Sequence, residues 1–183
     1  MNGDELMASL LKKEGTEWIS CFPSNELIEE VAKVGIRTLM FRQERGAIMA
    51  ADGFSRMNDR EKFGVVITQG GPGSENSMGG IAQAFGDNIP ILYLPGGPAL
   101  NQYAVRPNFS PVRTYETVSK YGEVIIQADQ VASVMRRAFL HAMRVQLRHL
   151  CGPSCRIRQH RARGRSPSSP IRSLMNHSTP TQI

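Results

Sequence analysis

The stretch QGGPGSENSMGG, residues 69–80, has five glycines and one proline in twelve positions and follows the apolar run FGVVIT. A glycine-rich turn at a helix start often binds phosphate, because its backbone amides face the anion. This stretch has no lysine for a nucleotide-binding loop, and Asn76 stands where a dinucleotide fingerprint needs its third glycine. Glu75 would repel a diphosphate from the first helical turn. We therefore expect either a ligand other than phosphate or only a tight turn.

A second candidate is a carboxylate in FRQERGAIMAADGFSRM, residues 41–57. On a helix of about 100° per residue, Glu44 lies on the same face as small and apolar residues such as Ala47 and Ala51. A buried carboxylate without a partner costs several kcal/mol, so Glu44 requires one. It could cap its own helix or meet a nearby cation such as Arg42, or it could face a ligand. The pattern alone leaves these alternatives open.

The last part of the chain differs in charge. Residues 1–144 hold 15 basic and 16 acidic side chains, whereas residues 145–183 hold seven arginines and no lysine or acidic residue. The tail therefore supplies the net charge of +6. It is rich in Arg, Ser and Pro, which predicts disorder because little apolar surface can be buried. An arginine-rich arm could bind nucleic acid non-specifically, but the remainder is nearly neutral, so we do not expect nucleic acid as the main partner.

Four side chains of this tail are potential zinc ligands: His149, Cys151, Cys155 and His160. Their C-x3-C spacing and short span differ from those of the common zinc fingers. We therefore predict no metal site in the chain. Cys21, inside a predicted strand, is interpreted as a small core residue rather than a nucleophile.

Apolar runs alternate with helical periodicity through residues 1–144. Strands that alternate with helices of about 10–15 residues predict a parallel sheet covered on both faces. We therefore predict one three-layer α/β/α domain with a mostly parallel sheet over residues 1–144, followed by the disordered basic tail at 145–183. The predicted strands are EWISCF, RTLMF, FGVVIT, IPILYLP and EVIIQ, and the predicted helices lie near 4–15, 24–35, 43–57, 74–85, 114 and 129–143.

Composition limits the remaining possibilities. A chain of 183 residues with 40% hydrophobic content can bury a sizeable core. It has no apolar run of about 18 residues and no basic stretch followed by an apolar one at its start, so we expect no membrane span and no secretory signal. The expected compartment is the cytoplasm. Three cysteines do not suggest a disulfide framework there.

Two strings together resemble a known family. RQERGAIMAADGFSR, followed by GVVITQGGPGSENSMGGIAQAFGDNIPILYLPG, is similar to the N-terminal pyrimidine-binding domain of thiamine diphosphate-dependent enzymes, the acetolactate synthase and 2-oxo acid decarboxylase superfamily. The likeness runs from about Asp4 to about Met143. It implies the thiamine diphosphate-binding fold, thiamine diphosphate as cofactor, and a 2-oxo acid as substrate of the complete enzyme.

The resemblance also implies roles for particular residues. Glu44 matches the family's catalytic glutamate, which hydrogen-bonds N1′ of the aminopyrimidine and favours the imino tautomer. The exocyclic nitrogen of that tautomer then takes the proton from thiazolium C2. Pro72, Gly73 and Asn76 match residues that line the pyrimidine pocket.

The loop after the first strand departs from the family. The segment CFPSN places Pro23 and Ser24 at the cofactor-binding position where the family usually has Pro-Gly. Serine has a side chain where glycine would let the ring approach the backbone. This departure favours a divergent acetolactate synthase-like branch.

Half of the family's site has no counterpart in the chain. In the family a separate domain binds the diphosphate and Mg²⁺ through a Gly-Asp-Gly motif followed by paired asparagines, and no such string occurs here. The family's site lies between domains of two subunits, so the resemblance implies a homo-oligomer or a partner subunit, and we expect no independent activity. We interpret the change near residue 144 as a frame shift or a mispredicted gene boundary. The alternative is a non-catalytic subunit that pairs with a separate diphosphate-domain chain.

Overall fold

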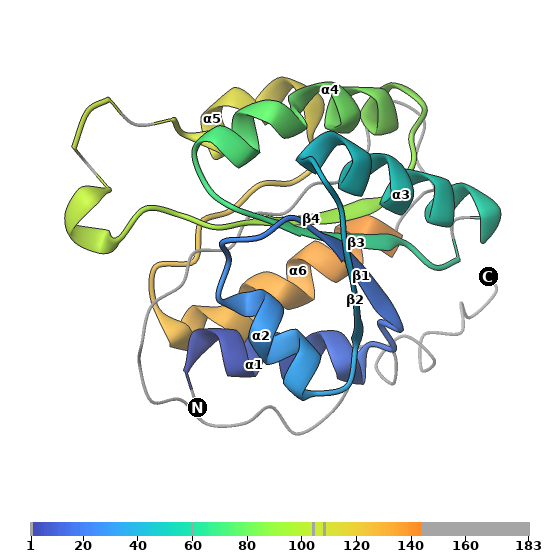
Figure 1. The fold of residues 1–183 in the computed structure, drawn as a ribbon, viewed down its shortest axis with the longest axis horizontal. Coiled ribbons are helices and arrows are strands. Elements are labelled where there is room, and N and C mark those ends of the chain that lie inside the picture. Colours follow the sequence, from blue (N-terminus) through green and yellow to red (C-terminus); the bar gives the residue numbers. More distant parts are fainter. Residues whose placement is uncertain (1, 60, 104, 108, 144–183) are drawn as a thin grey trace, which may run out of the picture.

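A four-stranded sheet lies between two layers of helices in the computed structural model, which describes residues 2–59, 61–103, 105–107 and 109–143 (Figure 1). The strand order is β2-β1-β3-β4 and every pairing is parallel. The predicted fold class, three-layer α/β with a parallel sheet, is confirmed. The strands are β1 (Trp18–Cys21), β2 (Arg37–Met40), β3 (Gly64–Thr68) and β4 (Ile91–Pro95).

The helices divide between the two faces of the sheet. In Figure 1, α3, α4 and α5 lie above the sheet and α1, α2 and α6 lie below it. This division produces two hydrophobic clusters, one on each face. The helices are α1 (Gly3–Lys13), α2 (Leu27–Lys33), α3 (Glu44–Met57), α4 (Pro72–Gly86), α5 (Pro111–Thr114) and α6 (Val131–Met143), and the short 3-10 turns are η1 (Leu100–Gln102), η2 (Glu116–Val118) and η3 (Ala128–Gln130).

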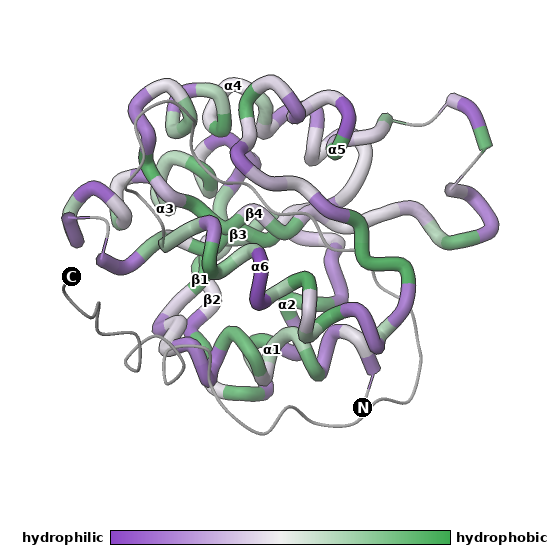
Figure 2. Tube along the Cα trace, turned by 180° about the vertical axis from the view of Figure 1, so that it is seen from behind, coloured by the Kyte–Doolittle hydropathy of each residue, from purple (hydrophilic) through white to green (hydrophobic). Residues whose placement is uncertain are grey.

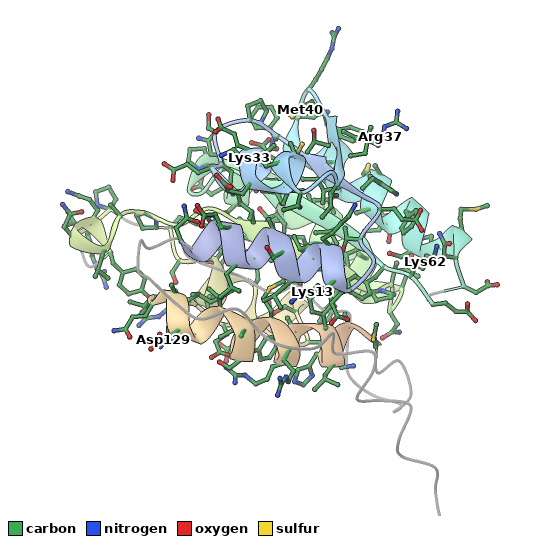
Figure 3. All side chains as sticks on the ribbon, turned by 90° about the horizontal axis from the view of Figure 1, so that it is seen from below. Lys13, Lys33, Arg37, Met40, Lys62 and Asp129 are labelled. Atoms are coloured by element: carbon green, nitrogen blue, oxygen red, sulfur yellow. The ribbon has the colours of Figure 1, made fainter. Side chains whose placement is uncertain are left out.

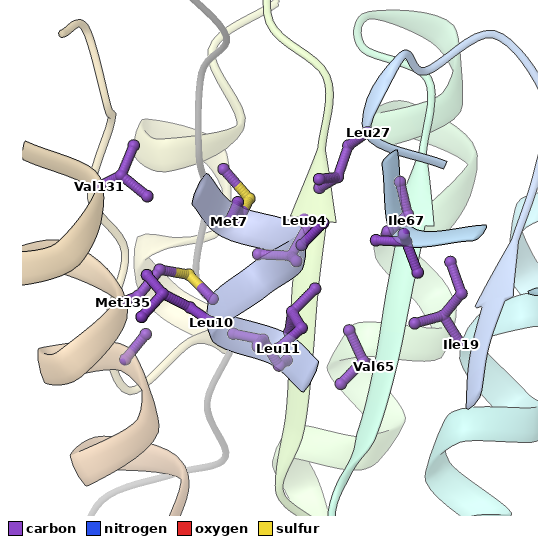
Figure 4. Packing of buried hydrophobic residues seen from close by; sticks show 14 of the residues in the cluster. Met7, Leu10, Leu11, Ile19, Leu27, Val65, Ile67, Leu94, Val131 and Met135 are labelled. Atoms are coloured by element: carbon purple, nitrogen blue, oxygen red, sulfur yellow. The ribbon is translucent and has the colours of Figure 1, made fainter. Parts of the chain in front are cut away.

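The central strands are buried on both faces. All five residues of β3 and of β4 are buried, and both strands are hydrophobic along most of their length in Figure 2. Alternate side chains enter different clusters: Val65 and Ile67 pack with α1 and α6, whereas Val66 packs with α3 and α4. Figure 4 shows the first cluster, with Leu11 of α1 beside the strands and Met135 of α6 facing α1.

The outer strand β2 is more exposed. Arg37 and Met40 are exposed, and Figure 3 shows both at the rim of the molecule. Met40 retains 56% of its surface in contact with solvent. Within the described residues, β2 pairs only with β1 and therefore forms an edge of the sheet.

One predicted strand is wrong. The segment EVIIQ, residues 123–127, forms no strand and joins no sheet in the part of the chain that the structure describes. The amides of Ile126 and Gln127 donate to Oε1 of Gln130, at 3.0 and 3.2 Å, instead of to a neighbouring strand. Ile125 is nevertheless buried against the first cluster, which explains the apolar pattern of the segment.

Because all four strands are parallel, the loops that follow them lie at one edge of the sheet. The chain passes from β1 to β2 on one side, then returns to β3 and β4 on the other, so β1 and β3 form a switch point. Ligands of open parallel sheets bind outside the carboxyl ends of the strands at such a point. The loops after β1 and β3 and the starts of α3 and α4 all lie at this edge.

Among the helices of the described ranges, none has the length and apolarity needed to cross a membrane. The predicted tail at 145–183, with its arginines and its possible zinc ligands, lies outside the described residues. The division into a domain at 1–144 and a tail stays a prediction.

Candidate functional site

Glu44 is the first residue of α3 and lies at the carboxyl edge of the sheet. Only 6% of its surface is exposed, as the helix-face argument predicts. Gln43 is the N-cap and makes no side-chain capping bond, while the amide of Ala47 donates to the Gln43 carbonyl. Over the described ranges no ion pair joins Glu44 to Arg42. Glu44 is therefore neither the cap of its own helix nor the partner of that arginine.

The partner of Glu44 comes from the glycine-rich loop. Nδ2 of Asn76 donates to Oε2 of Glu44 at 2.6 Å, across 32 positions of sequence. A hydrogen bond from an amide to an ionised carboxylate is stronger than one between neutral groups. The first turn of α4 also presents its backbone amides, whose partial positive charge favours a nearby carboxylate. Asn76 thus fixes one oxygen of the Glu44 carboxyl group.

The second carboxyl oxygen faces Gly73. A Cβ at Gly73 would lie 3.1 Å from Oε1 of Glu44 and 3.4 Å from Cβ of Gln69. Within the residues that the structure describes, Oε1 accepts no hydrogen bond. The absence of a side chain at position 73 therefore keeps space beside an oxygen that can still accept a proton donor.

A buried hydroxyl network holds the first turn of α4. Oγ1 of Thr68 lies 2.8 Å from the hydroxyl of Tyr93, which donates to Oγ of Ser77 at 3.0 Å. Ser77 in turn donates to the carbonyl of Gly73 at 2.7 Å. Burial raises the pKa of the Tyr93 hydroxyl, so it stays protonated and able to donate.

A second tyrosine supports the same turn. The hydroxyl of Tyr115 donates to the carbonyl of Ser74, and its ring lies 6.0 Å from that of Tyr93. The sequence analysis missed both tyrosines. A tyrosine inside a fully buried strand was the available signal, because its hydroxyl needs a polar partner when buried.

The other predicted cofactor residues lie in two places. Pro23 and Ser24 line an open cavity of about 590 Å³, together with Gly70 and Gly96 from the loops after β3 and β4. Pro72 is exposed at the first position of α4, where its fixed φ suits a helix start. Within the described part of the chain, no hydrogen bond or ion pair joins Pro23 or Ser24 to Glu44. The glycine-rich loop connects the two places, since Gly70 borders the cavity and Gly73 borders Glu44.

The loop shows no feature of a phosphate site beyond its glycines. Glu75 is exposed in the first turn of α4, where its charge opposes an anion. Over the described residues, no group of three or more His, Cys, Asp or Glu side chains could hold a metal ion. The arrangement can instead bind a neutral or cationic group that donates one hydrogen bond to Glu44.

Comparisons with known proteins show which family the chain resembles. The family described as "Thiamine pyrophosphate enzyme, N-terminal TPP binding domain" matches residues 1–118. Acetolactate synthase 2, chloroplastic, of Brassica napus is 25% identical over 151 residues, which cover 79% of this chain and 23% of that protein. Acetolactate synthase isozyme 3 large subunit of Escherichia coli is 28% identical over 145 residues, which cover 76% of this chain and 25% of that protein.

The matches cover most of this chain but only part of each relative. The chain spans about a quarter of the length of the curated relatives it matches. The family match covers well over half of the chain and contains both the Glu44 helix and the glycine-rich loop. The chain therefore belongs to the thiamine pyrophosphate (thiamine diphosphate) enzymes, and residues 1–118 correspond to their N-terminal TPP binding domain.

Proposed function

We propose that this chain binds the aminopyrimidine half of thiamine diphosphate, as part of an acetolactate synthase-like enzyme that decarboxylates or ligates 2-oxo acids. One observation carries the proposal. Glu44 is buried, Asn76 holds its Oε2 at 2.6 Å, and its Oε1 faces the space left by Gly73. In this proposal Oε1 accepts a hydrogen bond from the N1′–H of the protonated pyrimidine ring.

The residues present fit this part of the cofactor. A flat heteroaromatic ring can approach the backbone where Gly73 has no side chain, and its ring nitrogen can meet a carboxylate oxygen. A hydrogen bond to a charged group contributes about 1.5–3 kcal/mol. Glu44 would thereby favour a proton at N1′, while Asn76 keeps the carboxyl group in the required orientation. Pro23, Ser24 and Pro72 would border the ring from the two adjoining loops.

When bound, thiamine diphosphate supplies the electron sink that cleavage of a 2-oxo acid requires. Among the described residues, the start of α4 is unsuited to the diphosphate end, because it carries the exposed acidic side chain of Glu75. We therefore propose that Mg²⁺ and the diphosphate are bound by a further domain, in a second copy of the enzyme subunit or in a partner subunit. Independent activity of this chain is not expected. We place the assembly in the cytoplasm.

A binding experiment tests the proposal. The full chain is titrated with thiamine diphosphate by ligand-detected NMR, alongside Glu44→Gln and the matched control Glu61→Gln. Glu61 is exposed in the turn between α3 and β3, at the opposite edge of the sheet. We expect Glu44→Gln to weaken binding about tenfold or more, the loss of about 1.4 kcal/mol, and Glu61→Gln to bind as wild type does. Equal binding by all three chains would refute the role of Glu44.

The same titration distinguishes the main proposal from the alternative, a non-catalytic subunit that pairs with a separate diphosphate-domain protein. A chain that pairs with a separate diphosphate-domain protein should bind thiamine diphosphate more tightly when that protein is added, with Mg²⁺ present. It should also co-purify with it. A complex that forms but leaves both affinity and turnover unchanged would argue against a shared cofactor site.

A further inference from the structure

Three loops meet at the carbonyl of Thr68, the last residue of β3. Nδ2 of Asn25, from the loop after β1, donates to this carbonyl at 2.7 Å. The amide of Gly96, directly after β4, donates to the same oxygen at 2.8 Å. One carbonyl thus receives donors from the loops that follow β1 and β4, at the start of the glycine-rich loop.

The other end of the Asn25 side chain is also engaged. Its Oδ1 accepts a hydrogen bond from the amide of Leu27 at 3.1 Å, at the first residue of α2. The two bonds fix the orientation of the amide group, because reversing it would place an oxygen against the Thr68 carbonyl. Asn25 therefore ties the start of α2 to the end of β3.

The residue before Asn25 is held in an unfavourable conformation. Ser24 has φ +72°, in the left-handed region that is unfavourable for a residue with a Cβ. Such a conformation persists only where neighbouring interactions determine it. Pro23 restricts the chain on one side, and the Asn25 bonds fix it on the other. Pro23 and Ser24 border the cavity of about 590 Å³.

The glycine-rich loop meets the loop after β4 through backbone alone. A Cβ at Gly70 would lie 2.5 Å from the Gly96 carbonyl oxygen, so no side chain fits between the two loops. Both loops border the same cavity as Pro23 and Ser24. The loop after β1 joins the other two loops beside this cavity through the hydrogen bond of Asn25 to Thr68.

Thr68 also links Asn25 to the surroundings of Glu44. Its carbonyl accepts from Asn25, while its hydroxyl lies 2.8 Å from that of Tyr93. Tyr93 continues through Ser77 to the carbonyl of Gly73, the residue beside Oε1 of Glu44. A continuous series of hydrogen bonds thus connects the loop after β1 with the first turn of α4.

We propose that Asn25 is a positioning residue of the candidate site. It attaches the Pro23–Ser24 turn to Thr68 and so fixes this turn relative to the Glu44–Gly73 pair. A ring ligand can then contact both parts without reordering either loop, which avoids the cost of immobilising them on binding. The inference rests on the proposed function for the identity of that ligand, an aminopyrimidine, but the connection between the loops exists without it.

The test compares two substitutions that each remove one amide donor. Asn25→Asp keeps an acceptor for the Leu27 amide but loses the donor to the Thr68 carbonyl. Asn58→Asp is the matched control, because Nδ2 of Asn58 donates to the Phe54 carbonyl at 2.8 Å beyond the end of α3, at the opposite edge of the sheet. Each should lower the melting temperature, since each replaces an amide donor to a carbonyl by a carboxylate oxygen.

Two readouts decide the result in the full chain. In ligand-free protein, Asn25→Asp should shift the NMR amide resonances of Ser24, Gly70 and Gly73, whereas Asn58→Asp should not. With thiamine diphosphate as the probe, Asn25→Asp should weaken binding about tenfold and Asn58→Asp less than about twofold. Equal affinities of the two variants, or a Gly73 resonance that does not move, would overturn the proposal.

The two readouts also separate this inference from the proposed function. If wild type binds no thiamine diphosphate, the proposed function of the isolated chain fails. The ligand-free resonances still decide whether Asn25 couples the loops. If wild type binds the probe and Glu44→Gln weakens it, while Asn25→Asp binds as wild type does, the proposed function stands and the role of Asn25 is wrong.

Discussion

Replacing Asn76 by aspartate would place two carboxylates against each other. Asparagine and aspartate have nearly the same shape. The substitution, however, replaces the N–H donor that lies 2.6 Å from Oε2 of Glu44 by a carboxylate oxygen. At that separation the Coulomb repulsion is about 1.6 kcal/mol at the dielectric constant of water and about 6 kcal/mol at an effective value of 20. Glu44 is 6% exposed and Asn76 is exposed, so we expect a loss between these limits.

Asn76→Ala separates the repulsion from the loss of the hydrogen bond. Alanine removes the donor without adding a charge and should cost about 1.5–3 kcal/mol of unfolding free energy. Denaturant unfolding at pH 7 should show Asn76→Asp to be less stable than Asn76→Ala by the Coulomb amount. Two variants of equal stability at pH 7 would mean that residue 76 does not face Glu44.

Three further predictions concern the scaffold. Gly80→Ala should lower the unfolding free energy by about 1–3 kcal/mol, because the new Cβ would lie 2.8 Å from a side chain of α3. Gly53→Ala should instead raise it by about 0.8–1 kcal/mol, because a Cβ at Gly53 would have no atom within 4 Å and alanine favours the helix. Unfolding curves showing the same effect for both helical glycines would contradict the α3–α4 packing. The hydrogen bond from Lys62 lowers the pKa of Glu17 below the ordinary value of a glutamate, so Lys62→Met should raise that pKa in an NMR titration, and an unchanged titration would show that the pair does not form. Burial raises the pKa of the Cys21 thiol to about 11, so peptide mass spectrometry should find Cys21 unalkylated at pH 8 until the chain unfolds; alkylation of the native chain would place it at the surface.

The sequence predicted the layers because buried parallel strands are continuous apolar runs. FGVVIT and IPILYLP became β3 and β4 for this reason. EVIIQ is also an apolar run, yet it forms no strand in the described residues. Two of its backbone amides donate to the side chain of Gln130 and not to a neighbouring strand. An apolar run shows that a segment is buried, but only a neighbouring strand makes it part of a sheet.

The candidate site was predictable to a similar extent. The helix face of Glu44 indicated an inward carboxylate, and the lack of lysine argued against phosphate. The partner of Glu44 could not be deduced from the pattern, because Asn76 reaches it only through the packing of α4 on α3. Asn25 and Tyr93 were missed for the same reason. Their hydrogen bonds join segments that are 43 and 16 positions apart, and no local pattern records such contacts.

The central claim is that Oε1 of Glu44 meets the pyrimidine N1′. Thiamine diphosphate labelled with ¹⁵N at N1′ reports on this contact directly, through the chemical shift of that nitrogen in the presence of the full chain. We predict a shift towards the protonated form with wild type and none with Glu44→Gln at matched occupancy. The same N1′ shift with both chains would contradict the account.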